Sequence, residues 1–200
     1  MLIITRKRKK QVPKKKDYTK LYISLIIVVI FIFSIATYLS IANNNNKQQE
    51  WGDAPDFTVT TLDHGKLTLS DHIGKIILID FTAKNCGWCN EGGYDQYGNK
   101  IQGQIYELLD LYEQVGSDVV FISIDSWYHY ETEDDLRDMK EGYGAEWYFA
   151  MDDAEIDISG SYEVEAIPKL VLIDKNGNVY YSNSGLDTKE QLLQEINKKI

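Results

Sequence analysis

The chain contains two cysteines, Cys86 and Cys89, which are separated by Gly87 and Trp88. Two thiols at this spacing can close a disulfide between themselves or, when reduced, attack the disulfide of another molecule. The attacking species is a thiolate, so this chemistry needs one cysteine with a lowered pKa and a second cysteine that resolves the mixed disulfide. We therefore predict thiol–disulfide exchange, with Cys86 as the attacking thiol and Cys89 as the resolving thiol.

Two other uses of a cysteine pair are weaker alternatives. A zinc ribbon needs two more ligands, but the chain has no second cysteine pair, and His64, His72 and His129 are not in a paired spacing. We therefore predict no metal site. A purely structural disulfide at this spacing would close a loop too short to constrain much of the unfolded chain.

The residues that precede the cysteines indicate where they lie. Ile76–Phe81 is almost continuously apolar, so we expect a central strand that is buried on both faces. This strand would deliver Cys86 to the carboxyl edge of a sheet, where open α/β sheets hold their sites. A helix that begins at Cys86 would lower its thiol pKa from about 8.5 into the range of about 3.5–7.5. Burial of Asp80 would raise its carboxyl pKa into a range useful for proton transfer.

The rest of the carboxyl-terminal part shows a mixed α and β pattern. We expect hairpins over 57–69 and 170–181, a second buried strand over 119–124, and helices over 101–115, 132–141 and after Asp187 or Thr188. In the last helix, Leu192, Leu193, Ile196 and Ile200 should face inward. The strands that begin at 76 and 119 should be parallel and joined by a crossover. Residues 90–99 are poor helix formers, so the helix that starts at Cys86 should break there and resume at Ile101.

The amino-terminal part predicts a membrane anchor. Residues 1–20 hold nine basic residues and one acidic residue, whereas the other 180 residues carry 12 basic and 30 acidic ones. Leu21–Ile41 has no charge, Gly or Pro, and as a helix it would span roughly 31 Å, close to the hydrocarbon core of a bilayer. Tyr22 and Tyr38 lie near its ends, where aromatic rings favour the interface.

These charges predict an orientation and exclude one class of partner. The basic tail places the amino terminus in the cytoplasm and the remainder outside, in a single-pass protein of the cell membrane. The acidic remainder argues against nucleic-acid binding, because it would repel phosphates. We expect a cytoplasmic tail over 1–20, an anchor over 21–42, a polar linker over 43–52 and a folded domain over 53–200. Cleavage after Ser40-Ile41-Ala42, as at a signal-peptidase site, is the alternative.

Several motifs resemble the membrane-anchored, thioredoxin-like proteins of the TlpA/ResA group. They are Asp80-Phe81, Ala83, Cys86-Gly87 and Cys89, together with Ala54-Pro55-Asp56-Phe57 and Ile167-Pro168. The resemblance covers about residues 53–200 and implies a thioredoxin-like α/β fold, with a central mixed sheet flanked by helices and an N-terminal β-hairpin extension. It also implies that Asp80 relays the proton of Cys89. Ile167 and Pro168 would form a cis-proline loop that faces the cysteines and pairs with the substrate backbone.

Some positions depart from the family pattern. Trp88 stands where thioredoxins have Pro, and Lys169 follows the proline where they have Thr. ResA-like proteins carry a Glu three residues after the second Cys, but this chain has Gly92 there, so that role is not transferred. The aromatic segment 126–130 follows the second buried strand and should share an edge with the cysteines. Trp127 and Trp88 would then line a groove for an extended substrate, unless the loop folds on its own aromatics.

The resemblance implies a membrane-tethered oxidoreductase that reduces protein disulfides with electrons from a transmembrane dithiol carrier. No cofactor is expected beyond the redox-active Cys86–Cys89 disulfide, and the sequence does not set the direction of electron flow. One alternative is a thiol peroxidase, although Ala83 stands where peroxiredoxins have Thr. The other is a copper carrier of the same fold, which would use a longer cysteine spacing and a later histidine such as His129.

Overall fold

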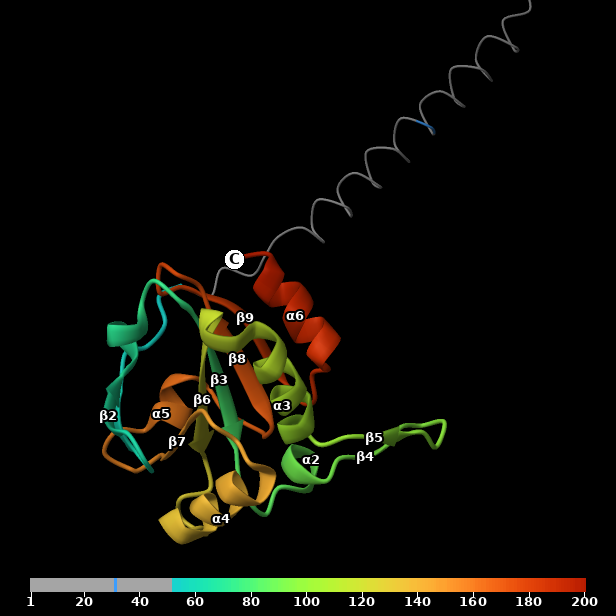
Figure 1. Ribbon diagram of the computed structural model, residues 1–200, viewed down its shortest axis with the longest axis horizontal. Helices are drawn as coiled ribbons and strands as arrows, with labels where there is room; N and C mark the ends of the chain where they lie inside the picture. The colour runs from blue at the N-terminus through green and yellow to red at the C-terminus, as the bar shows by residue number, and fades with distance from the viewer. Residues whose placement is uncertain (1–30, 32–51) are drawn as a thin grey trace, which may run out of the picture. The chain divides into compact units, whose positions relative to one another are not determined.

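A seven-stranded mixed sheet organises residues 52–200 (Figure 1). The computed structural model describes residue 31 and residues 52–200, so the predicted tail, anchor and linker lie almost wholly outside the described residues. Within the described part, no helix has the length and apolar character to cross a membrane. The strand order is β2-β1-β7-β6-β3-β8-β9. The strands span Thr58–Thr61 (β1), Gly65–Thr68 (β2), Ile76–Thr82 (β3), Val119–Asp125 (β6), Tyr148–Met151 (β7), Lys169–Ile173 (β8) and Val179–Ser184 (β9).

The apolar run before the cysteines forms the central strand β3, as predicted. All seven residues of β3 are buried, and the strand lies between β6, which is parallel to it, and β8, which is antiparallel. Successive side chains of a strand point to opposite faces, so the run supplies both cores. Ile76 and Leu78 join one cluster, and Ile77, Ile79 and Phe81 join the other.

Helices cover both faces of the sheet. They span Leu69–His72 (η1), Gly87–Asn90 (α2), Gln104–Val115 (α3), Gly116–Asp118 (η2), Glu133–Tyr143 (α4), Ile158–Ser161 (α5) and Lys189–Asn197 (α6). Apolar residues of α3, α4 and α6 join the first core, whereas Ile158 of α5 joins the second. Thr132 and Thr188 begin α4 and α6 with capping boxes, which satisfy otherwise unpaired N–H groups.

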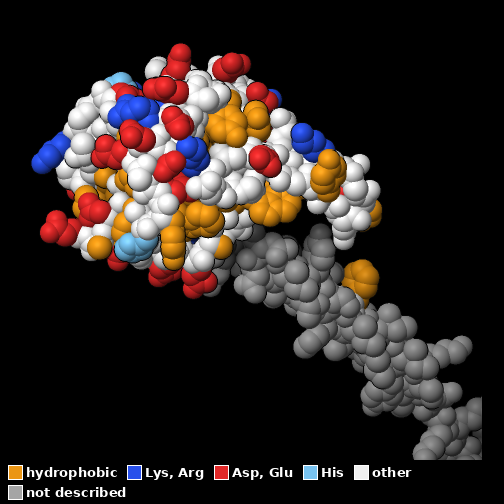
Figure 2. Space-filling view, turned by 90° about the horizontal axis from the view of Figure 1, so that it is seen from below, with side chains coloured by type: hydrophobic (Ala, Val, Ile, Leu, Met, Phe, Trp, Pro, Cys, Tyr) orange, Lys and Arg blue, Asp and Glu red, His pale blue; other side chains and the backbone are white. Residues whose placement is uncertain are grey.

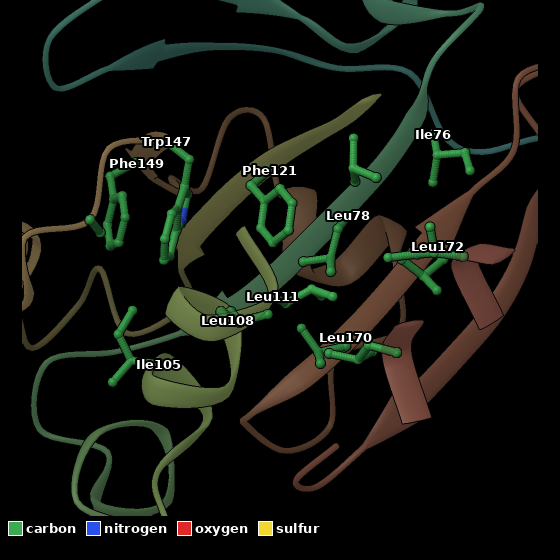
Figure 3. Packing of buried hydrophobic residues seen from close by; sticks show 14 of the residues in the cluster. Ile76, Leu78, Ile105, Leu108, Leu111, Phe121, Trp147, Phe149, Leu170 and Leu172 are labelled. Carbon is green, nitrogen blue, oxygen red and sulfur yellow. The ribbon is translucent and has the colours of Figure 1, made fainter. Parts of the chain in front are cut away.

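The first core is rich in aromatic side chains (Figure 3). Trp147 lies between Phe121 and Phe149, with ring centroids 5.7 Å from each. Tyr112 of α3 meets the edge of Phe121 at 5.2 Å. Aromatic pairs at these separations stabilise a core beyond the area that they bury, so they fix α3 over β6 and β7.

Four features differ from the sequence-based expectations. Strand β7 and helix α5 were not predicted, because both are only four residues long and depend on contacts with distant segments. Helix α3 begins at Gln104 instead of Ile101, which belongs to a small strand. Ile200 is 64% exposed instead of inward, because α6 ends at Asn197.

The predicted break after the cysteines is a β-hairpin. β4 (Gly93–Tyr94) pairs antiparallel with β5 (Lys100–Ile101), and the hairpin projects from the domain (Figure 1). Glycines allow close approach at its base. A Cβ atom at Gly92 would collide with the carbonyl oxygen of Ile101, and one at Gly103 would collide with that of Asn90. The glycines therefore let the hairpin join α2 to α3 without displacing either helix.

We expect Gly103→Ala to lower the free energy of unfolding by about 1–3 kcal/mol, because the added methyl group has no space. Urea unfolding followed by circular dichroism measures this change. Gly142→Ala adds the same methyl group where a Cβ atom meets nothing within 4 Å, and inside helix α4 it should leave the free energy of unfolding unchanged or raise it. Wild-type stability of Gly103→Ala would contradict the role of the close approach.

Candidate active site

The two cysteines lie just beyond the carboxyl end of β3 and form a disulfide. Cys86 is the N-cap residue of α2, and its Sγ accepts the backbone N–H of Cys89 at 3.2 Å. Cys86 is 6% exposed, whereas Cys89 is fully buried. An incoming substrate can therefore reach Cys86 more easily than Cys89.

The Ile167-Pro168 segment faces this disulfide, as predicted. The peptide bond between the two residues is cis, and the carbonyl oxygen of Ile167 lies 3.9 Å from Cys86 Sγ. The Ile167 side chain packs against Ala83, Cys86 and Cys89. The fold thus brings a main-chain acceptor to the attacking sulfur from 81 positions away along the chain. The substrate-binding roles of Ile167 and Pro168 stay predictions.

Asp80 is buried on β3, as predicted, at 2% exposure. Its Oδ2 accepts a hydrogen bond from Ser123 Oγ at 3.0 Å, and Ser123 Oγ in turn accepts the indole N–H of Trp147 at 2.9 Å. Its Oδ1 has no hydrogen-bond partner within the described residues. Burial raises the pKa of Asp80 to about 7, although the hydrogen bond from Ser123 opposes the shift. The carboxyl group can therefore gain or lose a proton near neutral pH.

Asn90 holds the segment that precedes the nucleophile. Its Nδ2 lies 2.9 Å from the carbonyl oxygen of Ala83, 2.7 Å from that of Lys84 and 3.0 Å from that of Cys86. Asn90 is 5% exposed. The sequence marked this residue only as a poor helix former, because its contacts with the preceding loop appear only in three dimensions.

Glu131 holds the same segment from the opposite direction. Its carboxylate accepts the backbone N–H groups of Lys84 at 2.7 Å and of Asn85 at 2.8 Å. It also accepts the side-chain amide of Asn85 at 2.9 Å. Glu131 was not among the predicted site residues, because it lies 46 positions from Asn85 and no local motif marks it.

The two tryptophans lie near the site, but their predicted groove stays a prediction. Trp88 is 47% exposed, and its ring lies so close to Gly93 that a Cβ atom there would collide with it. Trp127 is 38% exposed. Its loop reaches the active-site edge because the backbone N–H of Ser126 donates to the carbonyl oxygen of Thr82 at 3.0 Å. Part of that loop folds on its own aromatic rings, because Tyr128 and His129 lie 4.1 Å apart by ring centroids.

The fold and site define a class of protein. A mixed sheet with a Cys-x-x-Cys disulfide at the end of its central strand, faced by a cis-proline loop, is the arrangement of thioredoxin-like oxidoreductases. The chain belongs to the AhpC/TSA family, whose profile matches residues 52–182.

Sequence relatives agree with this class. The chain is 28% identical over 185 residues to the thiol-disulfide oxidoreductase ResA of Bacillus cereus, covering 91% of this chain and 98% of the relative. It is 27% identical over 178 residues to ResA of Bacillus anthracis, covering 89% and 94%. The family, these relatives and the Cys86–Cys89 disulfide make this chain a thiol–disulfide oxidoreductase.

Solved structures share the fold. A thiol-disulfide isomerase from Corynebacterium glutamicum matches with a TM-score of 0.60 at 18% identity, over 73% of this chain and 96% of that one. The thioredoxin domain of a thiol-disulfide oxidoreductase from Bacteroides vulgatus matches with a TM-score of 0.58 at 19% identity, over 73% and 96%. At these identities the likeness concerns the fold alone.

Proposed function

We propose that the protein is a membrane-tethered, extracytoplasmic oxidoreductase that reduces the disulfides of exported proteins through Cys86 and Cys89. The observation that carries the redox part of this proposal is the disulfide at the carboxyl edge of β3, with Cys86 Sγ 3.9 Å from the carbonyl oxygen of Ile167. The disulfide itself is the redox group, so the reaction needs no other cofactor.

The reaction begins from the reduced protein. The Cys86 thiolate attacks one sulfur of the substrate disulfide, so a mixed disulfide forms and the other substrate sulfur leaves as a thiolate, which takes a proton from solvent. Asp80, ionised at that moment, accepts the proton of the Cys89 thiol. The Cys89 thiolate then attacks Cys86 Sγ and closes the protein disulfide, while the second substrate sulfur leaves as a thiolate and takes up a proton from solvent. Asp80 returns its proton to solvent. Two electrons pass from the protein to the substrate.

The surroundings of the cysteines suit a polypeptide substrate. The carbonyl oxygen of Ile167 offers a main-chain acceptor beside Cys86, where an extended segment of substrate can pair with it. Trp88 and Trp127 present partly exposed rings near that edge. Acidic side chains prevail over Lys and Arg on the face shown in Figure 2, which favours a substrate that is not strongly acidic.

The amino-terminal sequence supports the proposed compartment and electron source. Leu21–Ile41 would anchor the chain, and the basic tail would stay in the cytoplasm. A domain held outside the membrane must receive electrons across it, so we propose a transmembrane dithiol carrier as the donor. The amino-terminal sequence of protein purified from membranes tests the anchor, and a chain that begins at Asn43 would overturn it.

A redox titration of the full chain in detergent tests the direction of electron flow. Thioredoxin-fold proteins span potentials from about −270 mV in reductants to about −120 mV in strong oxidants. A potential near the negative end supports a reductase, and one near the positive end would overturn that direction. Rapid consumption of hydrogen peroxide by the reduced protein, without disulfide exchange, would instead support the peroxidase alternative.

Trp127→Ala is expected to slow the reduction of a protein disulfide several-fold, because an exposed ring contributes contact area to a polypeptide. Turnover of a small disulfide should stay unchanged, because that substrate reaches only Cys86. Parallel assays with insulin and with a small aromatic disulfide make the comparison. Equal effects on the two substrates would remove Trp127 from the binding surface.

A further inference from the structure

Two buried acids lie behind the segment that leads to Cys86. Asp125 ends β6 and is opposite Thr82 in the register of β3 and β6, so it lies at the same edge of the sheet as the disulfide. Glu131 follows in the loop before α4. Asp125 is fully buried, and Glu131 is 5% exposed. Neither residue takes part in the proton transfer assigned to Asp80.

Both carboxyl oxygens of Glu131 act as hydrogen-bond acceptors. Its two oxygens accept three N–H groups from Lys84 and Asn85, at 2.7 to 2.9 Å. A carboxylate accepts hydrogen bonds and donates none, and charge-assisted bonds are roughly twice as strong as neutral ones. The side-chain amide of Asn90 donates hydrogen bonds to carbonyl groups of the same segment. The backbone just before Cys86 is thus held on both its donor and its acceptor sides.

The contacts of Asp125 suit a protonated carboxyl group. Its Oδ1 accepts the backbone N–H of Trp127 at 2.7 Å, whereas its Oδ2 is buried and has no donor among the described residues. Burial and then the neighbouring Glu131 carboxyl raise the pKa of Asp125 well above its ordinary value. The backbone N–H of Glu131 donates to the carbonyl oxygen of Trp127 at 3.1 Å, so Asp125 and Glu131 are both held by the backbone of Trp127. A proton on Oδ2 of Asp125 would let it donate to the Glu131 carboxyl group, which satisfies the buried oxygen.

We propose that Asp125 and Glu131 form a carboxyl pair that shares one proton and positions the Lys84–Asn85 segment, and with it the sulfur of Cys86. Glu131 is the positioning residue, and Asp125 keeps it in place by donating a hydrogen bond. The inference deepens the proposed function, because it rests on Cys86 being the attacking thiol.

The arrangement predicts that the positioning of the Cys86 sulfur depends on pH. When Asp125 loses its proton at alkaline pH, two adjacent buried carboxylates repel each other and the hold on the segment weakens. The other charged groups near the pair are Asp135 on α4, which also disfavours ionisation of Asp125, and Lys84, which pairs with Asp135 and Asp138 at 3.0 Å. On the β7 side, Asp152 accepts the N–H groups of Ile158 and Ser159.

Equilibration of the full chain with glutathione measures the equilibrium constant for closure of the Cys86–Cys89 disulfide, which depends on the position of Cys86. Glu131→Gln and Glu131→Asp are both expected to lower the equilibrium constant for closure about tenfold at pH 7, which is a potential about 30 mV more positive. Glu131→Asp keeps the charge but is too short to reach both N–H groups. Asp134→Asn removes an exposed charge from α4 and should leave the constant unchanged.

Asp125→Asn tests the shared proton. Its amide still donates to Glu131, so at pH 7 the constant should stay within about twofold of the wild-type value. Between pH 7 and pH 10 the wild-type constant, corrected for thiol ionisation, should fall, whereas that of Asp125→Asn should not. Wild-type behaviour of Glu131→Asp, or identical pH profiles for wild type and Asp125→Asn, would overturn the proposal. The glutathione assay needs no protein substrate. The equilibrium constant can therefore still be measured and interpreted if the protein turns out not to reduce exported proteins.

Discussion

Replacing Cys86 by Ser should reduce disulfide exchange at least about a thousandfold, because removal of a nucleophile leaves only binding effects. Cys86 is the more accessible sulfur of the pair and lies beside the main chain of Ile167. Reduction of insulin by the reduced variant measures the loss.

Cys89→Ser should behave differently from Cys86→Ser. Its Cys86 can still attack, but no buried thiol resolves the adduct, so the mixed disulfide accumulates. Mass spectrometry under non-reducing conditions, after mixing with a disulfide substrate, detects the covalent adduct. An adduct on Cys89 in the Cys86→Ser variant, with none on Cys86 in the other, would reverse the two roles. Full activity in either variant would contradict the mechanism altogether.

Asp80→Asn should lower turnover about a hundredfold at pH 7, within the range that positioned proton transfer contributes. The wild-type rate should rise as pH increases through about 7, because only the ionised carboxylate accepts the proton of Cys89. The variant has no carboxylate and should lack this step in its profile. A pH series of turnover between pH 5 and pH 9 makes the comparison, and a step that persists in Asp80→Asn would assign it to another group.

The same substitution should stabilise the folded protein at alkaline pH. The pKa of Asp80 is raised from its ordinary value of 3.8 to about 7 in the fold, so the folded state binds a proton that the unfolded state has lost. The free energy of unfolding of the wild type should therefore fall as pH rises from about 4 to about 7. The total loss should reach up to about 4 kcal/mol at pH values above 7.

Urea unfolding of the wild type and of Asp80→Asn measures how much the buried charge of Asp80 destabilises the fold. The variant should be the more stable protein at pH 8, and the advantage should shrink to less than about 1 kcal/mol near pH 4, where Asp80 is protonated in the fold and partly protonated in the unfolded chain. Ser123→Ala is a useful companion, because it removes the hydrogen bond at Oδ2 and should raise the pKa of Asp80 further. If the difference in free energy of unfolding between the variant and the wild type is the same at pH 4 and pH 8, then ionisation of Asp80 does not destabilise the fold.

The amino-acid sequence was sufficient to predict the chemistry and the central strand. The apolar run Ile76–Phe81 predicted β3 because burial on both faces requires apolar side chains at successive positions. Cys86 and Cys89 are neighbours along the chain, so their pairing needed no tertiary information. Asp80 and Pro168 were found because each belongs to a short motif next to a predicted strand.

The contacts that hold these groups in place are visible in the folded domain alone. Ser123 meets Asp80 across two strands, and Glu131 reaches Lys84 and Asn85 from the loop before α4. Polar residues of this kind have no periodicity, because each is placed by a single partner atom far away in sequence. The hairpin after Asn90 likewise depends on close backbone approaches that local propensities do not encode. The residues that react could therefore be predicted from the chain, whereas the residues that position them required the fold.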